Sequence, residues 1–298
     1  MKKLVFGSLN IDRTYQVAGF VRPKETVSAL DYACFCGGKG FNQAVALARA
    51  GSELYFAGVI GADGGMLRQG LLDEGIRTQL LKESAGANGH AVIQVNAQGE
   101  NCIIVVAGSN AEVSREYVDE VLAHFAAGDL IVLQNEIPHV DYIIERAGEK
   151  GMVIALNPSP FNSAMERCCL EQVRYLLINE VEGGELTGMS EPAEILDAIR
   201  ARFAGVAVVL TLGEKGAYFM AADGQRFFCP ASPCDCVDTT AAGDTFTGYF
   251  LTEYLEHGDA AEALRRAAAA SAIAVSRKGA SSSIPRREEV LQKIGAQL

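Results

Sequence analysis

The chain has 298 residues, of which 49% are hydrophobic and 21% are charged, and these proportions exclude a disordered polymer. Lysine and arginine total 26 against 37 for aspartate and glutamate, and the resulting net charge of −11 would repel a nucleic-acid backbone. We therefore expect one large folded domain with a small appendage, and no nucleic-acid partner.

The apolar segments predict neither a signal peptide nor a membrane span. The apolar run at the start ends at Gly7, too early for a secretory signal. The longest apolar stretches, Val206–Leu212 and Ala267–Val275, fall well short of the ~20 residues that cross a bilayer. We expect a cytoplasmic protein without membrane contact.

Eight cysteines are spread over the chain, and two pairs have Cys-x-Cys spacing, Cys34 with Cys36 and Cys234 with Cys236. No histidine lies near either pair, and the Cys-x-x-Cys spacing typical of zinc sites is absent from the sequence. We interpret the cysteines as reduced packing residues and assign no metal to them.

In chain order, the first predicted element is a strand over Leu4–Leu9, followed by an extended segment at Val27–Phe35. A glycine-rich turn then leads into a helix over Phe41–Ala50. Next, His90–Val95 and Asn101–Val106 have the pattern of a hairpin. Because no helix separates its strands, this hairpin and the segment at Val27–Phe35 predict a small antiparallel sheet that projects from the main domain.

The rest of the chain alternates between helices and strands. Ser114 can cap a helix through Phe125, and Glu191 and Pro192 open another that ends at Gly205. Apolar runs between the helices predict strands at Asp129–Gln134, Met152–Leu156, Tyr175–Asn179 and Val206–Leu212. Apolar strands separated by helices are typical of an α/β protein with a parallel sheet covered on both faces.

The strongest signal for chemistry is Asp238–Gly248, where small residues lead into a helix. Small residues allow close backbone approach, and the unpaired N–H groups of a helix start favour an anion such as phosphate. Asp244 falls in the first helical turn, where its carboxylate could take a proton from an attacking hydroxyl. The alternative is an ordinary helix start capped by Asp238 or Thr240, with Asp244 offsetting the helix dipole.

A second glycine-rich segment, Gly37–Ala44, also runs into a helix. It is not a Walker A loop, because Gly40 stands where Ser or Thr should hold magnesium. Its glycines with Lys39 and Asn42 suit a polyhydroxylated or anionic ligand. The alternative is a tight turn with a solvated lysine.

Polar residues also follow several predicted strands. Asn10 and Asp12 come at the end of the first strand, point the same way on an extended chain and could grip a diol. Glu136, Asn179 and the segment Thr211–Gly216 follow other strands. Ligands collect at the carboxyl ends of strands in open α/β sheets, although each residue alone could also serve as a turn or cap.

Together these motifs resemble those of the ribokinase family of carbohydrate kinases, of the phosphofructokinase-B type, and the resemblance runs from Leu4 to Pro285. It implies a ribokinase-like three-layer α/β/α domain over residues 1–298, with a mostly parallel central sheet and a small antiparallel β lid. The lid strands would lie at about 12–17, 27–36, 89–96 and 101–107.

The resemblance also implies roles for individual residues. The sugar would be held by Asn10, Asp12, Gly38, Lys39, Asn42 and Glu136. The phosphates, Mg²⁺ and the nucleotide would be bordered by Asn179, Glu182, Thr211, Gly213 and Gly216. The anion hole would comprise Ala241, Ala242 and Gly243, with Asp244 as the catalytic base. A K⁺ loop would use, mostly through backbone oxygens, Asp238, Thr240, Ala274, Arg277, Gly279 and Ser283.

Three positions depart from the family pattern. Phe41 replaces a usual small residue beside the sugar site, and Tyr249 is bulky where Ala or Gly is expected. Ala268 stands where a close ribokinase has a histidine near the adenine. Phe41 bears on the choice of sugar, and the other two bear on packing and on the grip on the nucleotide.

The resemblance implies a cytoplasmic, homodimeric kinase that transfers the γ-phosphoryl group of ATP to O5 of D-ribose with Mg²⁺ and K⁺. Alternatives in the same class are a kinase for 2-deoxyribose, another free sugar or a nucleoside. A non-catalytic sugar sensor would have no need of the base Asp244. A Rossmann-type oxidoreductase would need a Gly-x-Gly-x-x-Gly after the first strand, and none is present.

Overall fold

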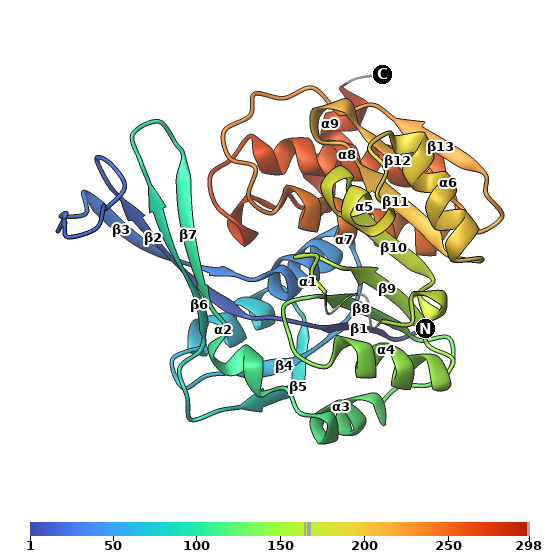
Figure 1. The fold of residues 1–298 in the computed structure, drawn as a ribbon, viewed down its shortest axis with the longest axis horizontal. Coiled ribbons are helices and arrows are strands. Elements are labelled where there is room, and N and C mark those ends of the chain that lie inside the picture. Colours follow the sequence, from blue (N-terminus) through green and yellow to red (C-terminus); the bar gives the residue numbers. More distant parts are fainter. Residues whose placement is uncertain (164, 166–167, 297–298) are drawn as a thin grey trace.

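The computed structural model describes residues 1–163, 165 and 168–296. In this part of the chain a nine-stranded sheet forms the centre of the molecule (Figure 1). Across the sheet the strands are β13 (Arg226–Cys229), β12 (Ala217–Met220), β11 (Ala207–Thr211), β10 (Tyr175–Asn179), β9 (Val153–Asn157), β8 (Leu130–Gln134), β1 (Lys3–Phe6), β4 (Tyr55–Ile60) and β5 (Arg77–Glu83). From β5 to β11 neighbouring strands are parallel, whereas β12 and β13 add an antiparallel edge.

Alternate residues of the central strands enter two separate cores, one on each face of the sheet. Val5 and Val132 belong to the core beneath the first helix layer, and Phe6 and Leu133 belong to the opposite core. The first layer contains α1 (Lys39–Ala50), α2 (Gly65–Asp73), α7 (Ala242–His257), α8 (Ala260–Val275) and α9 (Arg287–Gly295). The second contains α3 (Arg115–Leu122), α4 (Val140–Glu149), α5 (Glu180–Thr187) and α6 (Pro192–Arg202). The expected three-layer α/β/α fold is confirmed.

A second, four-stranded sheet projects from this body, on the left of Figure 1. Its order is β3 (Asp31–Gly37), β2 (Asn10–Gln16), β6 (Gly89–Val95) and β7 (Asn101–Val106). The hairpin of β6 and β7 is confirmed, but β2 and β6 pair in parallel, so the sheet is only mostly antiparallel.

Several boundaries differ from those predicted. The strand expected from Val27 begins at Asp31, and the one expected over Leu4–Leu9 ends at Phe6. The next strand, β2, starts at Asn10 and belongs to the small sheet, because the chain leaves the large sheet in between. Ser114 does cap α3, accepting a hydrogen bond from the Tyr117 N–H. No helix in the described residues is long and apolar enough to cross a membrane.

Candidate active site

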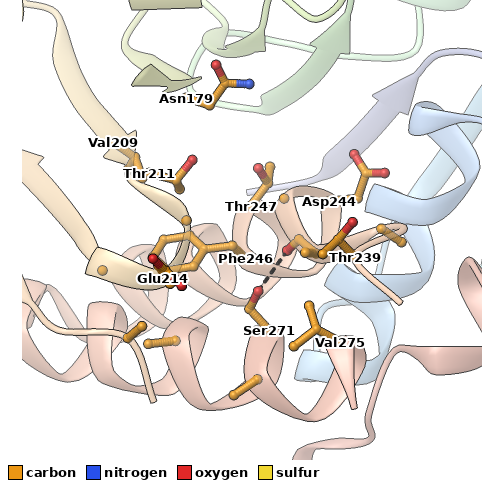
Figure 2. Close-up of a pocket in the computed structure, with 18 of the residues that line it drawn as sticks. Asn179, Val209, Thr211, Glu214, Thr239, Asp244, Phe246, Thr247, Ser271 and Val275 are labelled. Atoms are coloured by element: carbon orange, nitrogen blue, oxygen red, sulfur yellow. Dashed lines mark hydrogen bonds between the residues drawn. The ribbon is translucent and has the colours of Figure 1, made fainter. Parts of the chain in front are cut away.

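A cavity of about 820 Å³ opens where the parallel strands β9 to β11 end and α7 begins (Figure 2). Its lining includes Asp244 and Thr247 of α7, and Thr211 and Asn179 from two strand ends. Its size is typical of a site for a small organic ligand. The rim expected at the carboxyl ends of the strands is therefore present, and it meets the start of a helix.

The start of α7 is built as an open helix end. Ala241 adopts a left-handed conformation with φ of 59°, and no side chain caps the helix, so neither Asp238 nor Thr240 has the alternative capping role. The Ala242 N–H donates to the Thr239 carbonyl at 3.2 Å. The next N–H group, of Gly243, has no acceptor within the helix, because the first turn of any helix lacks them.

The Ala242 carbonyl accepts a hydrogen bond from the Ser271 hydroxyl of α8 at 3.1 Å, drawn as a dashed line in Figure 2. The three residues expected as an anion hole therefore line the cavity, and the hydrogen bond from Ser271 fixes the turn that carries them.

Asp244 is only 7% exposed, and both of its carboxylate oxygens are oriented by α1. The Asn42 amide donates to Oδ2 at 3.2 Å and the Gln43 amide donates to Oδ1 at 2.9 Å. The orientation of Gln43 is fixed in turn, because its oxygen accepts from the Gln134 amide at 2.6 Å. A carboxylate held at both oxygens is preorganised to accept a proton at one position.

Helices α1 and α7 can lie this close because Gly248 faces α1. A Cβ at Gly248 would lie 2.4 Å from the Ala46 methyl group. The bulky Tyr249 beside it is fully buried, and its hydroxyl donates to the Pro285 carbonyl at 2.8 Å. This departure from the family pattern is therefore accommodated by packing.

The start of α1 carries Lys39, whose ammonium interacts with the carboxylates of Asp244 and Glu136. The Lys39 N–H and the Ser8 hydroxyl both donate to Glu136 Oε2, at 2.9 and 2.5 Å. Burial lowers the pKa of the Lys39 ammonium, but Asp244, Glu136 and Glu182 together raise it above its usual value. Lys39 is therefore a cation held among three carboxylates at the cavity.

Gly38 caps α1 with φ of 89°, which favours glycine. A Cβ there would lie 3.0 Å from the Asn10 backbone nitrogen and 3.1 Å from the Ser8 hydroxyl oxygen. The glycine-rich turn can therefore lie directly against the start of β2.

Asn10 and Asp12 lie on β2, at the base of the small sheet. Asn10 is buried, and its side-chain oxygen accepts from the Asn110 amide at 2.7 Å. The Asp12 carboxylate lies directly over Gly37, where a Cβ would approach it to 2.0 Å. Burial, with a smaller contribution from Glu136, raises the pKa of Asp12 to about 7.

On the other side of the cavity, Asn179 and Glu182 form a capping box at the start of α5. The Asn179 side chain accepts from the Glu182 N–H at 2.9 Å, and the Glu182 carboxylate accepts from the Asn179 N–H at 3.1 Å. Gly213 and Gly216 turn the chain after β11 with φ of 56° and 119°. All four residues line the cavity with Thr211.

Asp238 joins the two segments expected to form a cation loop. Its carboxylate accepts from the Thr240 N–H at 2.9 Å and from the Gly279 N–H at 3.0 Å. Burial raises the pKa of Asp238, but these hydrogen bonds outweigh it and the pKa lies below its usual value. Of the other expected members of the loop, Ala274 lies in the last turn of α8, and Arg277 and Ser283 follow the end of that helix.

The interpretation of the paired cysteines as packing residues is wrong for three of the four. Cys34, Cys234 and Cys236 are exposed and do not pack in the interior, because the small sheet and the segment before α7 are not covered. Phe41 is 2% exposed, and its ring packs against α2 at Gly70, so it contributes to the core, and its bearing on the choice of sugar stays a prediction.

Two residues of the site were missed by sequence reasoning. Gln43 donates a hydrogen bond to Asp244. The Ser8 hydroxyl donates to the Glu136 carboxylate and accepts from the Gly40 N–H. Gln43 could have been found, because it follows Asn42 at the same helix start. Ser8 lies in a turn with no distinguishing pattern.

An open helix start facing a cavity, with a buried carboxylate in its first turn, is the arrangement of a phosphoryl-transfer enzyme. The pfkB family carbohydrate kinase profile matches residues 2–287, and the chain belongs to this family. A ribokinase from Haemophilus influenzae is 37% identical in an alignment that covers 97% of this chain and 96% of that relative. A deoxyribokinase from Salmonella typhi is 33% identical over 96% of each chain. The structure of Arabidopsis thaliana ribokinase complexed with ribose and ATP matches with a TM-score of 0.86 and 29% identity over 98% of each chain.

Proposed function

We propose that this protein is a kinase that transfers the γ-phosphoryl group of ATP to O5 of D-ribose and releases D-ribose 5-phosphate. The observation that carries the proposal is the placement of Asp244, at an anion-favouring helix start and hydrogen-bonded to the helix that also bears Lys39. The ribokinase relatives support the choice of sugar. A deoxyribokinase at 33% identity makes 2-deoxyribose the second candidate.

In the proposed reaction Asp244 accepts the hydroxyl proton as the sugar oxygen attacks the γ-phosphorus in line. The bond from the γ-phosphorus to the β–γ bridging oxygen breaks, and ADP leaves. The amides of Asn42 and Gln43 keep the carboxylate in place. The N–H groups at the start of α7, with the helix dipole, stabilise the negative charge on the transferring group.

We assign sugar binding to Asn10, Asp12, Gly38, Lys39, Asn42 and Glu136, which surround the junction between β2 and α1. The nucleotide would lie along Thr211, Gly213 and Gly216, beyond the anion hole of Ala241, Ala242 and Gly243. This order places the γ-phosphate between the sugar and the nucleotide, beside Asp244.

Magnesium fits the edge formed by Glu182 and Asn179, whose oxygens are of the kind that Mg²⁺ prefers. In the described residues no group of three or more His, Cys, Asp or Glu could hold a metal ion. When bound, the ion neutralises charge on those phosphates. Glu182 and Asn179 would hold the ion, and their capping box keeps both side chains at this edge.

We further propose that the loop joined by Asp238 binds K⁺. The carbonyls of Ala274 and Ala280 lie in this region and already accept from Arg277 and Ser283, which fixes their orientation. Ordered carbonyls next to the anion hole would act on charge in the transition state. At constant ionic strength we expect activity to rise with KCl and much less with NaCl. Equal rates in the two salts would remove the cation site and leave the kinase proposal standing.

We also propose that residues 1–298 act as one kinase domain whose small sheet is both a lid over the sugar and the contact of a homodimer. The exposed apolar residues of β7, from Ile103 to Val106, support a covered state of this sheet. A cytoplasmic location is proposed on the exposed cysteines, which form no disulfide in the part of the chain that the structure describes.

The proposal is tested by measuring ADP release with ribose, 2-deoxyribose, hexoses and nucleosides in turn. We expect the largest kcat/KM for ribose, with a product that is phosphorylated at O5 by NMR. A larger kcat/KM for 2-deoxyribose would favour the second candidate. ADP release that no sugar or nucleoside stimulates would reject both.

A further inference from the structure

The wall of the nucleotide cavity contains two exposed thiols that the proposed reaction does not use. Cys234 and Cys236 lie between the end of β13 and the start of α7, and both line the same cavity as Asp244. Their neighbours Pro233 and Thr239 line it too. A group attached to either sulfur would therefore extend from the wall of a space of about 820 Å³.

The segment that carries the two thiols is held at several points. At its start, Gly216 lies so close that a Cβ there would be 2.2 Å from the Cys229 carbonyl oxygen. In its middle the Lys293 ammonium donates to the Pro233 carbonyl at 3.1 Å. At its end the N–H groups of Val237 and Asp238 both donate to the Val275 carbonyl, at 2.8 and 3.1 Å. These contacts keep the two thiols at the cavity.

We propose that Cys234 and Cys236 form a covalent modification site for small-molecule disulfides, and that a modified thiol and a bound nucleotide exclude each other. The inference rests on the proposed function only in taking this cavity as the nucleotide site. The thiolate of either cysteine attacks one sulfur of the disulfide, whose S–S bond breaks as the protein–S–S bond forms. The other half leaves as a thiolate with the electron pair of the broken S–S bond, and the proton that the cysteine lost goes to the solvent, so atoms and electrons balance.

The remaining cysteines provide internal controls. Cys34 and Cys102 on the small sheet are exposed, as is Cys169 after β9, and none of the three lines the cavity, so their modification leaves its volume intact. Cys168 is buried. Cys36 and Cys229 are half-buried. Burial raises the pKa of Cys36 to about 11 and also raises the pKa of Cys229, which disfavours the reactive thiolate of both. The effect on nucleotide binding should therefore come from Cys234 and Cys236 alone.

The test treats the full chain with dithiobis(nitrobenzoate), a disulfide whose departing half is coloured, and measures ADP binding by calorimetry. Each protein is compared with its own untreated sample. We expect treatment to weaken ADP binding by roughly 10-fold or more, a change that dithiothreitol reverses. Saturating ADP should in turn slow the release of the coloured thiolate from two of the cysteines.

Two double variants locate the effect. In Cys234→Ser/Cys236→Ser, treatment should change ADP affinity by less than about 2-fold. In Cys34→Ser/Cys102→Ser, treatment should weaken ADP binding as much as it does in the chain without substitutions. An equal loss of ADP binding in the Cys234/Cys236 variant, or no slowing of its reaction by ADP in the natural chain, would overturn the inference. Failure of the untreated chain to bind ADP at all would instead reject the proposed function.

Discussion

One strand of the large sheet and one strand of the small sheet are similarly apolar but differ completely in burial. Strand β8 of the large sheet, Leu130–Gln134, is buried at every position, whereas all six residues of β7 in the small sheet are exposed. Ile131 is 0% exposed and Ile104 is 60% exposed. Helices cover both faces of the large sheet, and none in the described residues covers this edge of the small one. An apolar strand therefore indicates a surface that is buried in the working protein, but not that residues of the same chain bury it.

In the proposed function the chemistry lies on the large-sheet side, and the small sheet closes the site. Asp244→Asn should therefore have the largest effect, lowering kcat by roughly 10²- to 10⁴-fold, the usual range for the loss of a positioned base. Folding and sugar binding should persist, because the amide has the shape of the carboxylate. A rotated Asn42 amide can also accept from the new N–H group with its side-chain oxygen, which has no other hydrogen-bond partner among the described residues. Steady-state assays of ADP release would measure the change in kcat, and circular dichroism would show whether the variant is folded.

The control for this variant is Asp197→Asn, which makes the same charge change on an exposed residue of α6. It should keep normal turnover. A folded Asp244→Asn enzyme that turns over at a rate near that of the unchanged chain would reject the assigned base.

A matched pair of isoleucine truncations tests the contrast between the sheets directly. Ile131→Ala should lower the free energy of unfolding by about 2–5 kcal/mol, because it leaves a cavity in the core. Ile104→Ala should cost less than about 1 kcal/mol in a dilute monomer, since the side chain is exposed there. Urea unfolding at two protein concentrations measures both.

If the small sheet is covered by a second copy, the cost of Ile104→Ala grows with protein concentration, while that of Ile131→Ala does not. Equal costs for the two variants in dilute solution would contradict the contrast in burial.

Substitutions at Leu30 and at Tyr32 of β3 test the proposed dimer. Leu30 is 73% exposed and Tyr32 is 51% exposed. Replacing both with Lys should give monomers by light scattering, because like charges would meet across a two-fold interface. The KM for the sugar should also rise several-fold, roughly 2- to 10-fold, if lid and interface are one element. Leu291→Lys, on the exposed side of α9, should remain dimeric. An unmodified chain that is monomeric at micromolar concentration would refute the shared sheet.

The strands β8 to β11 of the large sheet were predictable, because each is a mostly apolar run with a predicted helical stretch between it and the next. The helix start at Asp244 was also predictable, since small residues before a helix have a specific physical use. The pair Asn179 and Glu182 was recognised as a motif, but it is equally a capping box, and that signal for α5 was not used. Local patterns thus identified the elements that local contacts form.

Contacts between distant segments could not be predicted. The parallel pairing of β2 with β6 joins residues about eighty positions apart, and nothing in either strand encodes its direction. The contact of Gln43 with Asp244 depends on the close approach that Gly248 permits between α1 and α7. The exposure of Cys234 and Cys236 follows from a segment without regular structure, whose course depends on distant anchors.

The smallest expected effect concerns Asp12, at the base of the small sheet where it joins the body. Its pKa is raised from 3.8 to about 7, mainly by burial, so between these pH values the folded chain holds a proton that the unfolded chain has released. The stability gained from this proton is complete below about pH 4 and is lost as the pH rises through 7. The free energy of unfolding should therefore fall by about 1–2 kcal/mol between pH 5 and 8, less than the full pKa change implies, because water and side chains relax around the carboxylate.

Asp12→Asn cannot titrate and removes only this contribution, whereas the histidines and the carboxylate of Glu136 remain the same in both proteins. Urea unfolding at pH 5 and pH 8 should thus show a smaller pH-dependent loss of stability in the variant than in the unchanged chain. Cys36, the other titratable side chain affected by Asp12, has its pKa at about 11 and stays protonated throughout. The same pH dependence in both proteins would mean that the Asp12 carboxyl is open to water, and that the base of the small sheet is as exposed as its outer strand.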